Sequence, residues 1–183
     1  MKINFMAKDG TKVVFREPKM SDVKSMMSFA NRIISEKRSG MVMNKKLTLK
    51  EEKEFLRKTI KNKERDSVFL VVDYKGKIVG TTNIARRTGK QYHVANFGIM
   101  LSKDMRGKGI GEALMRTIIK LAKKKIMGLE IIRLDVYDYN KRALSLYRKL
   151  KFKKITILPD SDKEDGKYIS TIVLYLYLKK RAR

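Results

Sequence analysis

The chain contains no cysteine and a single histidine, His93, among its 183 residues. Without cysteine it can form no disulfide, no thiolate nucleophile and no cysteine-ligated metal site. One imidazole alone also excludes a metal site built from several histidines. No apolar run approaches the roughly 20 residues that a membrane-spanning helix needs, and residues 1–5 lack the long apolar stretch of a signal peptide. From these absences we expect a cytoplasmic protein that uses no metal and does not enter the membrane.

Proline is also scarce, and both examples, Pro18 and Pro159, stand near expected ends of secondary structure elements. The sequence has no internal repeat, no proline-rich linker and no low-complexity segment. Its length suits one domain with a full hydrophobic core. We therefore predict a single domain over residues 1–183.

Acidic residues are few: 19 Asp and Glu stand against 45 Lys and Arg, which gives a net charge of +26. A surface of this sign attracts polyanions, although a lysine-rich solvated surface without a selected partner explains the excess equally well. The basic runs at 123–125 and 179–183 permit nucleic-acid binding, but no motif that reads DNA or RNA accompanies them. Association with nucleic acid or with the ribosome stays an alternative, or a secondary property.

The spacing of apolar residues predicts alternating strands and helices. Ser21 can cap a first helix, and Thr48 with Glu51 forms a capping box before a second. A long helix is expected from Ile110 and a short one around Ala143. The expected strands are 13–15, 68–72, 78–84, 92–101, 131–137, 152–158 and 168–178, the last two joined by a polar loop. This order, β-αα-βββ-α-β-α-ββ, predicts an α/β (α+β) fold with a mixed sheet of about seven strands and helices on both faces.

A glycine-rich turn between a strand and a helix is the most specific feature of the sequence. Its residues are Arg106, Gly107, Lys108, Gly109, Ile110 and Gly111. Glycines allow a tight turn and a close approach to a ligand, and the free N–H groups and dipole at a helix start favour a pyrophosphate. The turn lacks the Gly-Lys-Ser/Thr end of a Walker loop and the Gly-x-Gly-x-x-Gly spacing of a dinucleotide fingerprint. A glycine turn without any ligand stays open as well.

Around this turn the sequence resembles the GNAT superfamily of N-acyltransferases. The acyl-CoA motif of that family, Gln/Arg-x-x-Gly-x-Gly/Ala, is matched by Arg106, Gly109 and Gly111. The other similar segments are 94–101, 134–137, 140–147 and 149–152. The resemblance covers roughly residues 92–153 and implies the GNAT fold, with acetyl-CoA as the acyl donor.

The resemblance also implies which residues bind acetyl-CoA. The edge of the strand at 99–101 would pair with the pantetheine amides, and the N–H groups of 106–111 would hold the pyrophosphate. Asn140 matches a family residue near the cofactor, and it can also cap the last helix. The residues so assigned are Ile99, Met100, Leu101, Arg106, Gly107, Lys108, Gly109, Ile110, Gly111, Asn140, Ala143 and Tyr147.

Tyr147 matches the family tyrosine that faces the thioester sulfur. A phenol, with a pKa of about 10, can protonate the departing thiolate near neutral pH. The other interpretation is a core tyrosine on the apolar stripe of its helix.

The general base is less clear from the sequence. Many relatives carry a glutamate where this chain has Asn96, and an amide cannot accept the proton. A water chain through Asp135 or Tyr137 could replace it. His93 has a suitable pKa but is expected at the surface, and Glu36 could line the acceptor site.

These assignments predict an N-acetyltransferase in which a primary amine attacks acetyl-CoA directly in a ternary complex. An α-amine needs about 1 kcal/mol to be neutral at pH 7 and a lysine amine about 4.6 kcal/mol, so a site with a weak base favours an α-amine. The loop at 36–47 holds Lys37, Arg38, Lys45 and Lys46, which favours an acidic peptide or protein, or a small acidic amine. A CoA-binding regulator without turnover is the alternative, and a homodimer through the strand at 168–178 stays open.

Overall fold

The structure, a computed structural model, describes residues 1–38, 40, 45–61 and 66–179. The predicted basic loop at 36–47 is therefore described only in part, and residues 180–183 of the predicted basic tail lie outside the described residues. Within the described part no helix is long and apolar enough to cross a membrane. Its helices are α1 (Val23–Ile34), α2 (Leu49–Lys61), α3 (Ile110–Lys125) and α4 (Lys141–Lys149). Its strands are β1 (Lys2–Met6), β2 (Lys12–Arg16), β3 (Ser67–Tyr74), β4 (Lys77–Arg86), β5 (Val94–Leu101), β6 (Ile131–Tyr137), β7 (Lys153–Glu164) and β8 (Lys167–Tyr177).

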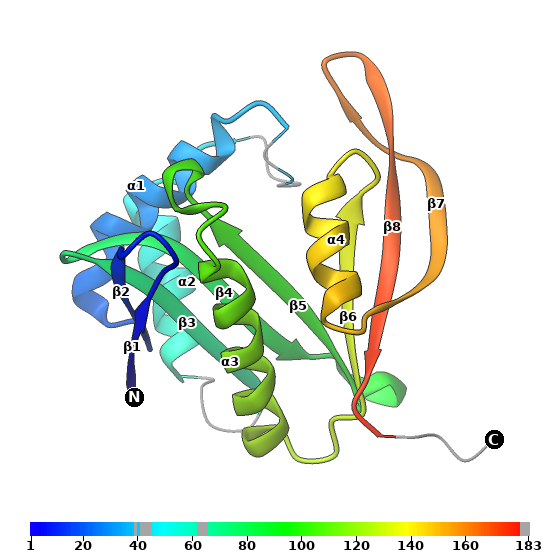
Figure 1. The fold of residues 1–183 in the computed structure, drawn as a ribbon, viewed down its shortest axis with the longest axis horizontal. Helices are drawn as coiled ribbons and strands as arrows, with labels where there is room; N and C mark the ends of the chain where they lie inside the picture. The colour runs from blue at the N-terminus through cyan, green and yellow to red at the C-terminus, as the bar shows by residue number, and fades with distance from the viewer. Residues whose placement is uncertain (39, 41–44, 62–65, 180–183) are drawn as a thin grey trace. The chain divides into compact units, whose positions relative to one another are not determined.

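The mixed α/β fold predicted from the sequence is confirmed (Figure 1). The strand order is β1-β2-β3-β4-β5-β6-β8-β7, with one strand more than expected among the described residues. The additional strand, β1, pairs antiparallel with β2. Phe5 of β1 stacks on Phe15 of β2 with ring centroids 5.5 Å apart. The strand is short, so its alternating pattern is a weak signal in the sequence.

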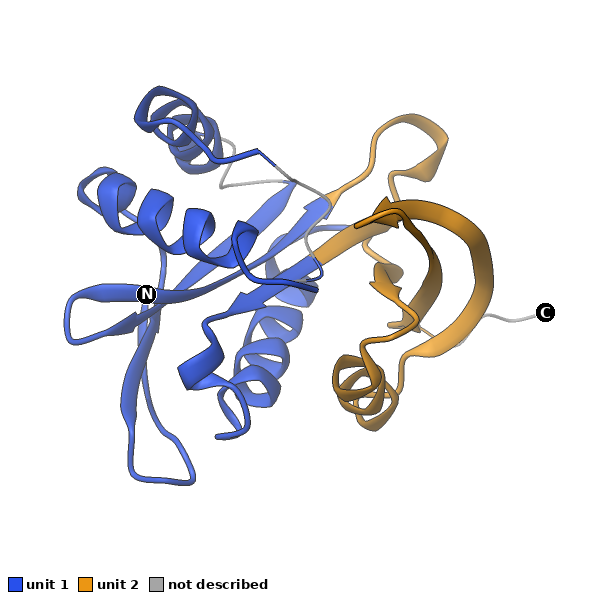
Figure 2. Cartoon of the chain, turned by 90° about the horizontal axis from the view of Figure 1, so that it is seen from above, with its two compact units in different colours: residues 1–85, 98–127 blue, residues 86–97, 128–183 orange. Residues whose placement is uncertain are grey.

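The chain divides into two compact units (Figure 2). Unit 1 comprises Met1–Ala85 and Gly98–Met127. In it, α1 and α2 lie on one face of the strands and α3 lies on the other (Figures 1 and 2). The core between the helix pair and the strands is a cluster of buried apolar side chains, with Ile60, Phe69 and Met100 packed against it. Its buried members are Val23, Met26, Phe29, Ile33, Leu56, Val71 and Ile78.

Unit 2 comprises Arg86–Phe97 and Gly128–Arg183. The first residues of β5 pair in parallel with β6, which pairs antiparallel with β8. The sequence predicted a polar loop after Leu158, and this prediction is wrong. β7 instead continues to Glu164 and pairs with β8 through a tight turn, because Asp165 and Gly166 adopt the left-handed conformation that such a turn requires.

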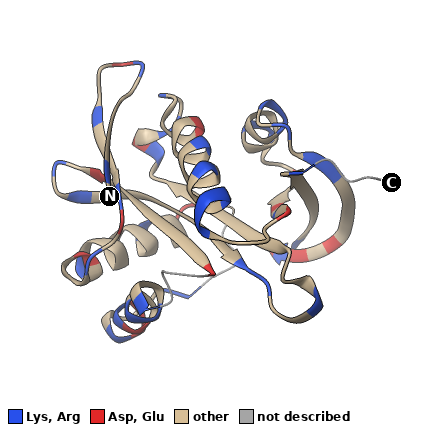
Figure 3. Ribbon diagram, turned by 90° about the horizontal axis from the view of Figure 1, so that it is seen from below, with Lys and Arg blue, Asp and Glu red and all other residues tan. Residues whose placement is uncertain are grey.

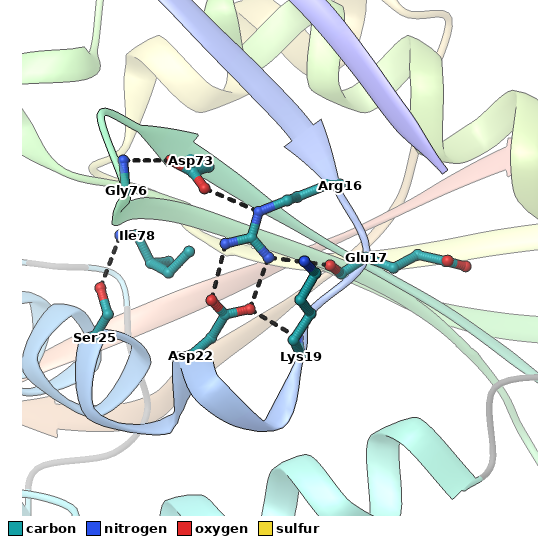
Figure 4. Close-up of polar contacts among 8 residues, drawn as sticks. All are labelled: Arg16, Glu17, Lys19, Asp22, Ser25, Asp73, Gly76 and Ile78. Atoms are coloured by element: carbon teal, nitrogen blue, oxygen red, sulfur yellow. Dashed lines mark hydrogen bonds and ion pairs between the residues drawn. The ribbon is translucent and has the colours of Figure 1, made fainter.

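An ion network joins the start of α1 to the β3–β4 hairpin (Figure 4). The Arg16 guanidinium donates to both carboxylate oxygens of Asp22, at 2.7 and 2.8 Å, and its Nε donates to Asp73 at 2.9 Å. The Lys19 N–H donates to the same Asp22 carboxylate at 2.7 Å. Burial alone would raise the pKa of Asp22, but the hydrogen bonds outweigh it and the pKa is lowered.

The start of α1 also corrects a prediction. We expected Ser21 to cap this helix, but α1 begins at Val23 with Asp22 in the N-cap position. The Asp22 side chain makes no capping bond to the helix, because Arg16 and Lys19 occupy its oxygens. The capping box at Thr48 and Glu51 is confirmed, with the Thr48 N–H donating to the Glu51 carboxylate at 2.7 Å.

Candidate active site

The residues assigned from the sequence are divided between the two units. Unit 1 holds Glu36, the end of β5 at 99–101 and the glycine turn at 106–111. Unit 2 holds the remaining assigned residues, which are Asn96, Asp135, Asn140, Ala143 and Tyr147.

The glycine turn leads directly into α3 in a conformation that depends on glycine. Gly107 and Gly109 have φ values of 89° and 84°, a region that side chains with a Cβ rarely adopt. Gly109 is the N-cap residue of α3, and no side chain caps this helix. The first N–H groups of a 16-residue helix are therefore left without a capping partner from a side chain. This is the arrangement in which a helix start binds an anion.

Both cations of the turn are paired with acidic residues of unit 1. Arg106 Nη2 lies 2.6 Å from Glu36, and its Nε donates to the Leu101 carbonyl at 2.8 Å. Lys108 Nζ lies 2.8 Å from Asp9. The hydrogen bond from Lys108 lowers the pKa of Asp9 to about 2, and the same contact raises the pKa of Lys108. Each cation of the turn therefore has an acidic partner within unit 1.

The loop of the β1–β2 hairpin lies against the turn. The Lys8 N–H donates to the Lys108 carbonyl at 3.1 Å. A Cβ built on Gly109 would lie 3.6 Å from Lys8 Cγ. This contact was not predicted from the sequence, because β1 was not expected. The alternation of Ile3 and Phe5 before Gly10 is the signal that could have revealed the hairpin.

The end of β5 carries the edge assigned to the pantetheine arm. The ladder between β5 and β6 covers Val94–Asn96, so Ile99, Met100 and Leu101 lie beyond it. All three side chains are half-buried. The Leu101 carbonyl is already the acceptor for Arg106.

In unit 2, Asn140 caps α4. Its side-chain oxygen accepts from the Ala143 N–H at 3.1 Å, and its carbonyl accepts from the Leu144 N–H at 3.0 Å. The capping interpretation of Asn140 is thereby confirmed. The cap fixes the start of the helix that carries Tyr147.

Tyr147 is buried and also packs in the core. Its ring lies 5.9 Å from that of Phe152, which in turn lies 6.4 Å from Phe97. Burial raises the pKa of Tyr147 to about 12. Within the described part of the chain its hydroxyl has no hydrogen-bond partner. The phenol is therefore protonated at neutral pH and has its proton available to a ligand.

Asn96, Asp135 and Tyr137, which were considered as the base or as its replacement, are engaged elsewhere or exposed, and His93 is half-buried beside Tyr92. Asn96 is exposed, and Asp135 is exposed and accepts two hydrogen bonds from Arg133, at 2.9 and 3.0 Å. The Tyr137 hydroxyl donates to Asp162 at 3.3 Å, and burial raises its pKa to about 12. The described residues contain no group of three or more acidic or histidine side chains that could hold a metal ion.

Glu52 is a buried acidic residue that was not among the residues predicted from the sequence. Only 4% of the residue is exposed, and burial raises its pKa. Its position four residues before Leu56, on the apolar stripe of α2, is the signal that could have singled it out.

Comparisons with known proteins agree with this fold. Residues 37–152 match the model of the acetyltransferase (GNAT) family. The structure resembles that of a phosphinothricin acetyltransferase from Sinorhizobium meliloti, which was solved in complex with AcCoA. The TM-score is 0.79 at 18% identity, covering 91% of this chain and 88% of that one. At this identity the likeness shows the fold.

Two archaeal relatives are similar in sequence. An uncharacterised N-acetyltransferase of Methanocaldococcus jannaschii is 34% identical over 100 residues, which is 50% of this chain and 42% of that protein. An N-alpha-acetyltransferase of Sulfurisphaera tokodaii is 30% identical over 107 residues, which is 52% of this chain and 62% of that protein. The matches thus span about half the length of these relatives. Because the family model covers more than half of the 183 residues, this chain belongs to the acetyltransferase (GNAT) family.

Proposed function

We propose that this protein transfers an acetyl group from acetyl-CoA to a primary amine. The observation that carries the proposal is the glycine turn, whose two left-handed glycines open α3 without a side-chain cap. That turn matches the acyl-CoA motif of the family to which the chain belongs. The N–H groups at the start of α3 bind the pyrophosphate, and the backbone edge at 99–101, beyond the ladder with β6, pairs with the pantetheine amides.

Tyr147 acts as the general acid in this proposal. Bound acetyl-CoA supplies the thioester carbonyl that the neutral amine attacks, forming the C–N bond and breaking the C–S bond. The Tyr147 hydroxyl donates its proton to the sulfur as the thiolate departs. The proton lost by the nitrogen passes to water, from which the tyrosine recovers its own. A pKa of about 12 keeps the phenol protonated between turnovers.

The acceptor is proposed to be the α-amine of a peptide or protein. Neither Asn96 nor Asp135 is placed as a buried, unpaired base, which favours the amine that is easiest to deprotonate. The name of the Sulfurisphaera relative, an N-alpha-acetyltransferase, supports the same acceptor. The lysines and arginine of the loop at 36–47 favour acidic residues after that amine.

A thiol-release assay over a panel of amines tests the proposal. The panel contains tetra-alanine, a peptide with an acidic second residue, a peptide with a blocked α-amine and a free lysine side chain, and spermidine. We expect thiol release with the α-amines and the highest kcat/KM with the acidic peptide. A preference for spermidine would contradict the charge argument. Acetyl-CoA binding without thiol release for any amine would instead indicate a CoA-binding regulator.

A further inference from the structure

Glu52 lies on α2 with its side chain turned inward. The residue is 4% exposed, and its carboxylate has no hydrogen bond or ion pair within the described part of the chain. Buried carboxylates are almost always paired, because desolvation of an isolated charge is costly. This chain has 45 Lys and Arg residues from which a partner could have come. The absence of one is therefore a feature to explain.

Capping of α2 does not explain why Glu52 is buried without a partner, because the neighbouring Glu51 caps this helix. The Thr48 N–H and hydroxyl both donate to the Glu51 carboxylate at 2.7 Å, and the Glu51 N–H donates to Thr48 Oγ1 at 3.3 Å. This reciprocal capping box is complete without a second acid.

The surroundings of Glu52 place it on the side of the helix pair that faces the strands. Glu52 and Leu56 are one helical turn apart and are the two buried residues of α2. Leu56 packs in the core cluster of unit 1, against which Met100 of β5 also packs. Met100 belongs to the edge assigned above to the pantetheine arm.

The end of α1 and the start of α2, where Glu52 lies, are linked to the glycine turn. The Asn31 side chain, in the last turn of α1, accepts from the Leu47 N–H at 2.7 Å and donates to its carbonyl at 3.0 Å. The start of α2 is thereby held beside the end of α1. Just after α1, Glu36 pairs with Arg106 of the turn at 2.6 Å. Glu36 is thus paired with Arg106, whereas Glu52 is a buried acid that has no partner among the described residues.

We propose that the Glu52 carboxylate binds the ammonium group of the acceptor amine. The inference rests on the proposed function, since it assigns a residue to the acceptor side of that same reaction. A primary ammonium supplies the positive charge and the N–H donors that the buried carboxylate lacks, and it releases one proton to water before the neutral amine attacks. It also explains how a protein with a net charge of +26 admits a cationic substrate, because one buried carboxylate gives it a local site. The ligand class is a primary ammonium.

The substitution Glu52→Gln tests the inference, because it keeps the shape of the side chain and removes its charge. The matched control is Glu54→Gln, an exposed acid on the same helix. Kinetics of thiol release are measured with tetra-alanine, and acetyl-CoA binding is measured by calorimetry. For Glu52→Gln we expect the KM for tetra-alanine to rise by about tenfold or more, with the Kd for acetyl-CoA unchanged. Glu54→Gln should change neither.

Thermal unfolding of Glu52→Leu separates binding from a structural role. Replacing an unpaired buried carboxylate by an apolar side chain should leave the unfolding temperature unchanged or raise it. A lower unfolding temperature, or an unchanged KM for Glu52→Gln, would contradict the inference alone. Wild-type protein that binds acetyl-CoA but acetylates no amine would contradict the proposed function and this inference together.

Discussion

The Tyr147 hydroxyl is protonated and, among the described residues, unpaired, although burial makes it a weaker acid than an ordinary phenol. Its hydroxyl has no partner within the described part of the chain, and burial raises its pKa to about 12, so the proton is present at every pH at which the protein would work. Its ring packs on Phe152 at the same time. The catalytic and the core interpretations of this residue are therefore compatible.

The substitution Tyr147→Phe should separate the catalytic role from the packing role, because it removes the hydroxyl and keeps the ring. We expect kcat for thiol release to fall by about 10²–10⁴-fold, the typical contribution of a general acid. Acetyl-CoA binding and the unfolding temperature should stay near wild-type values. Tyr92→Phe, at an exposed tyrosine of the same unit, is the control. Wild-type turnover by Tyr147→Phe would show that the tyrosine is a packing residue.

At the scale of elements, the β1–β2 hairpin supports the glycine turn. In a trans peptide the carbonyl and the following N–H point in opposite directions. The bond from the Lys8 N–H to the Lys108 carbonyl therefore turns the Gly109 N–H away from the hairpin. The ion pair between Asp9 and Lys108 holds the two loops together. The hairpin precedes residue 37, where the match to the family model begins.

Asp9→Asn should loosen this support. We expect the Kd for acetyl-CoA to rise roughly two- to fivefold, as for other exposed ion pairs. The KM for S-acetylpantetheine, which lacks the pyrophosphate, should not change. Because the pKa of Asp9 is lowered to about 2, the pair contributes above the usual aspartate pKa of about 4 and is lost as the pH falls toward 2. Tighter binding by Asp9→Asn would mean that Asp9 withholds Lys108 from the phosphates.

The ion network at the start of α1 should stabilise the fold without affecting the site. Asp22→Asn leaves the buried Arg16 without its main partner, and we expect a loss of about 3 kcal/mol in the free energy of unfolding. Urea denaturation measures this, with the exposed Asp165→Asn as a control expected within about 0.5 kcal/mol of wild type. Since the pKa of Asp22 is lowered in the folded state, its contribution is present above about pH 4 and disappears as the pH falls through the folded pKa. A difference independent of pH would contradict the role assigned to the carboxylate.

An element could be predicted from the sequence where its contacts are local, and it was missed where its contacts join distant parts of the chain. The apolar stripe of α3 and the turn before it are local patterns, and both were predicted. The pairing of β1 with β2 and the extension of β7 to Glu164 depend on partners elsewhere in the chain, and both were missed. The family resemblance singled out Tyr147, whereas the spacing of Glu52 from Leu56 is a weak signal and its lack of a partner is visible only in the structure. The single-domain expectation stays a prediction.

At the scale of the whole molecule, the charge excess is spread rather than gathered. Lys and Arg occur on helices, strands and loops of both units, with Asp and Glu between them (Figure 3). Lys123, Lys124 and Lys125 form the last turn of α3, where positive charges interact favourably with the helix dipole. Lys125 also pairs with Glu17 at 3.2 Å. This distribution favours a general attraction for polyanions.

Binding to duplex DNA should therefore show no sequence preference. We expect its affinity to fall by orders of magnitude between about 50 and 200 mM salt, as expected for contacts to phosphates alone. Fluorescence anisotropy with two unrelated duplexes measures both properties. Binding that persists at high salt and favours one duplex would point to a dedicated nucleic-acid site instead.

The central claim is that the glycine turn binds acetyl-CoA, and calorimetric titration of two glycine variants tests it most directly. Gly109→Ala and Gly76→Ala replace glycines with similar φ values, 84° and 80°, in the same unit, so the cost of backbone strain is matched. We predict that wild type and Gly76→Ala bind acetyl-CoA with similar Kd values, while Gly109→Ala loses at least tenfold in affinity. Equal binding by all three proteins, or no binding by wild type, would contradict the claim.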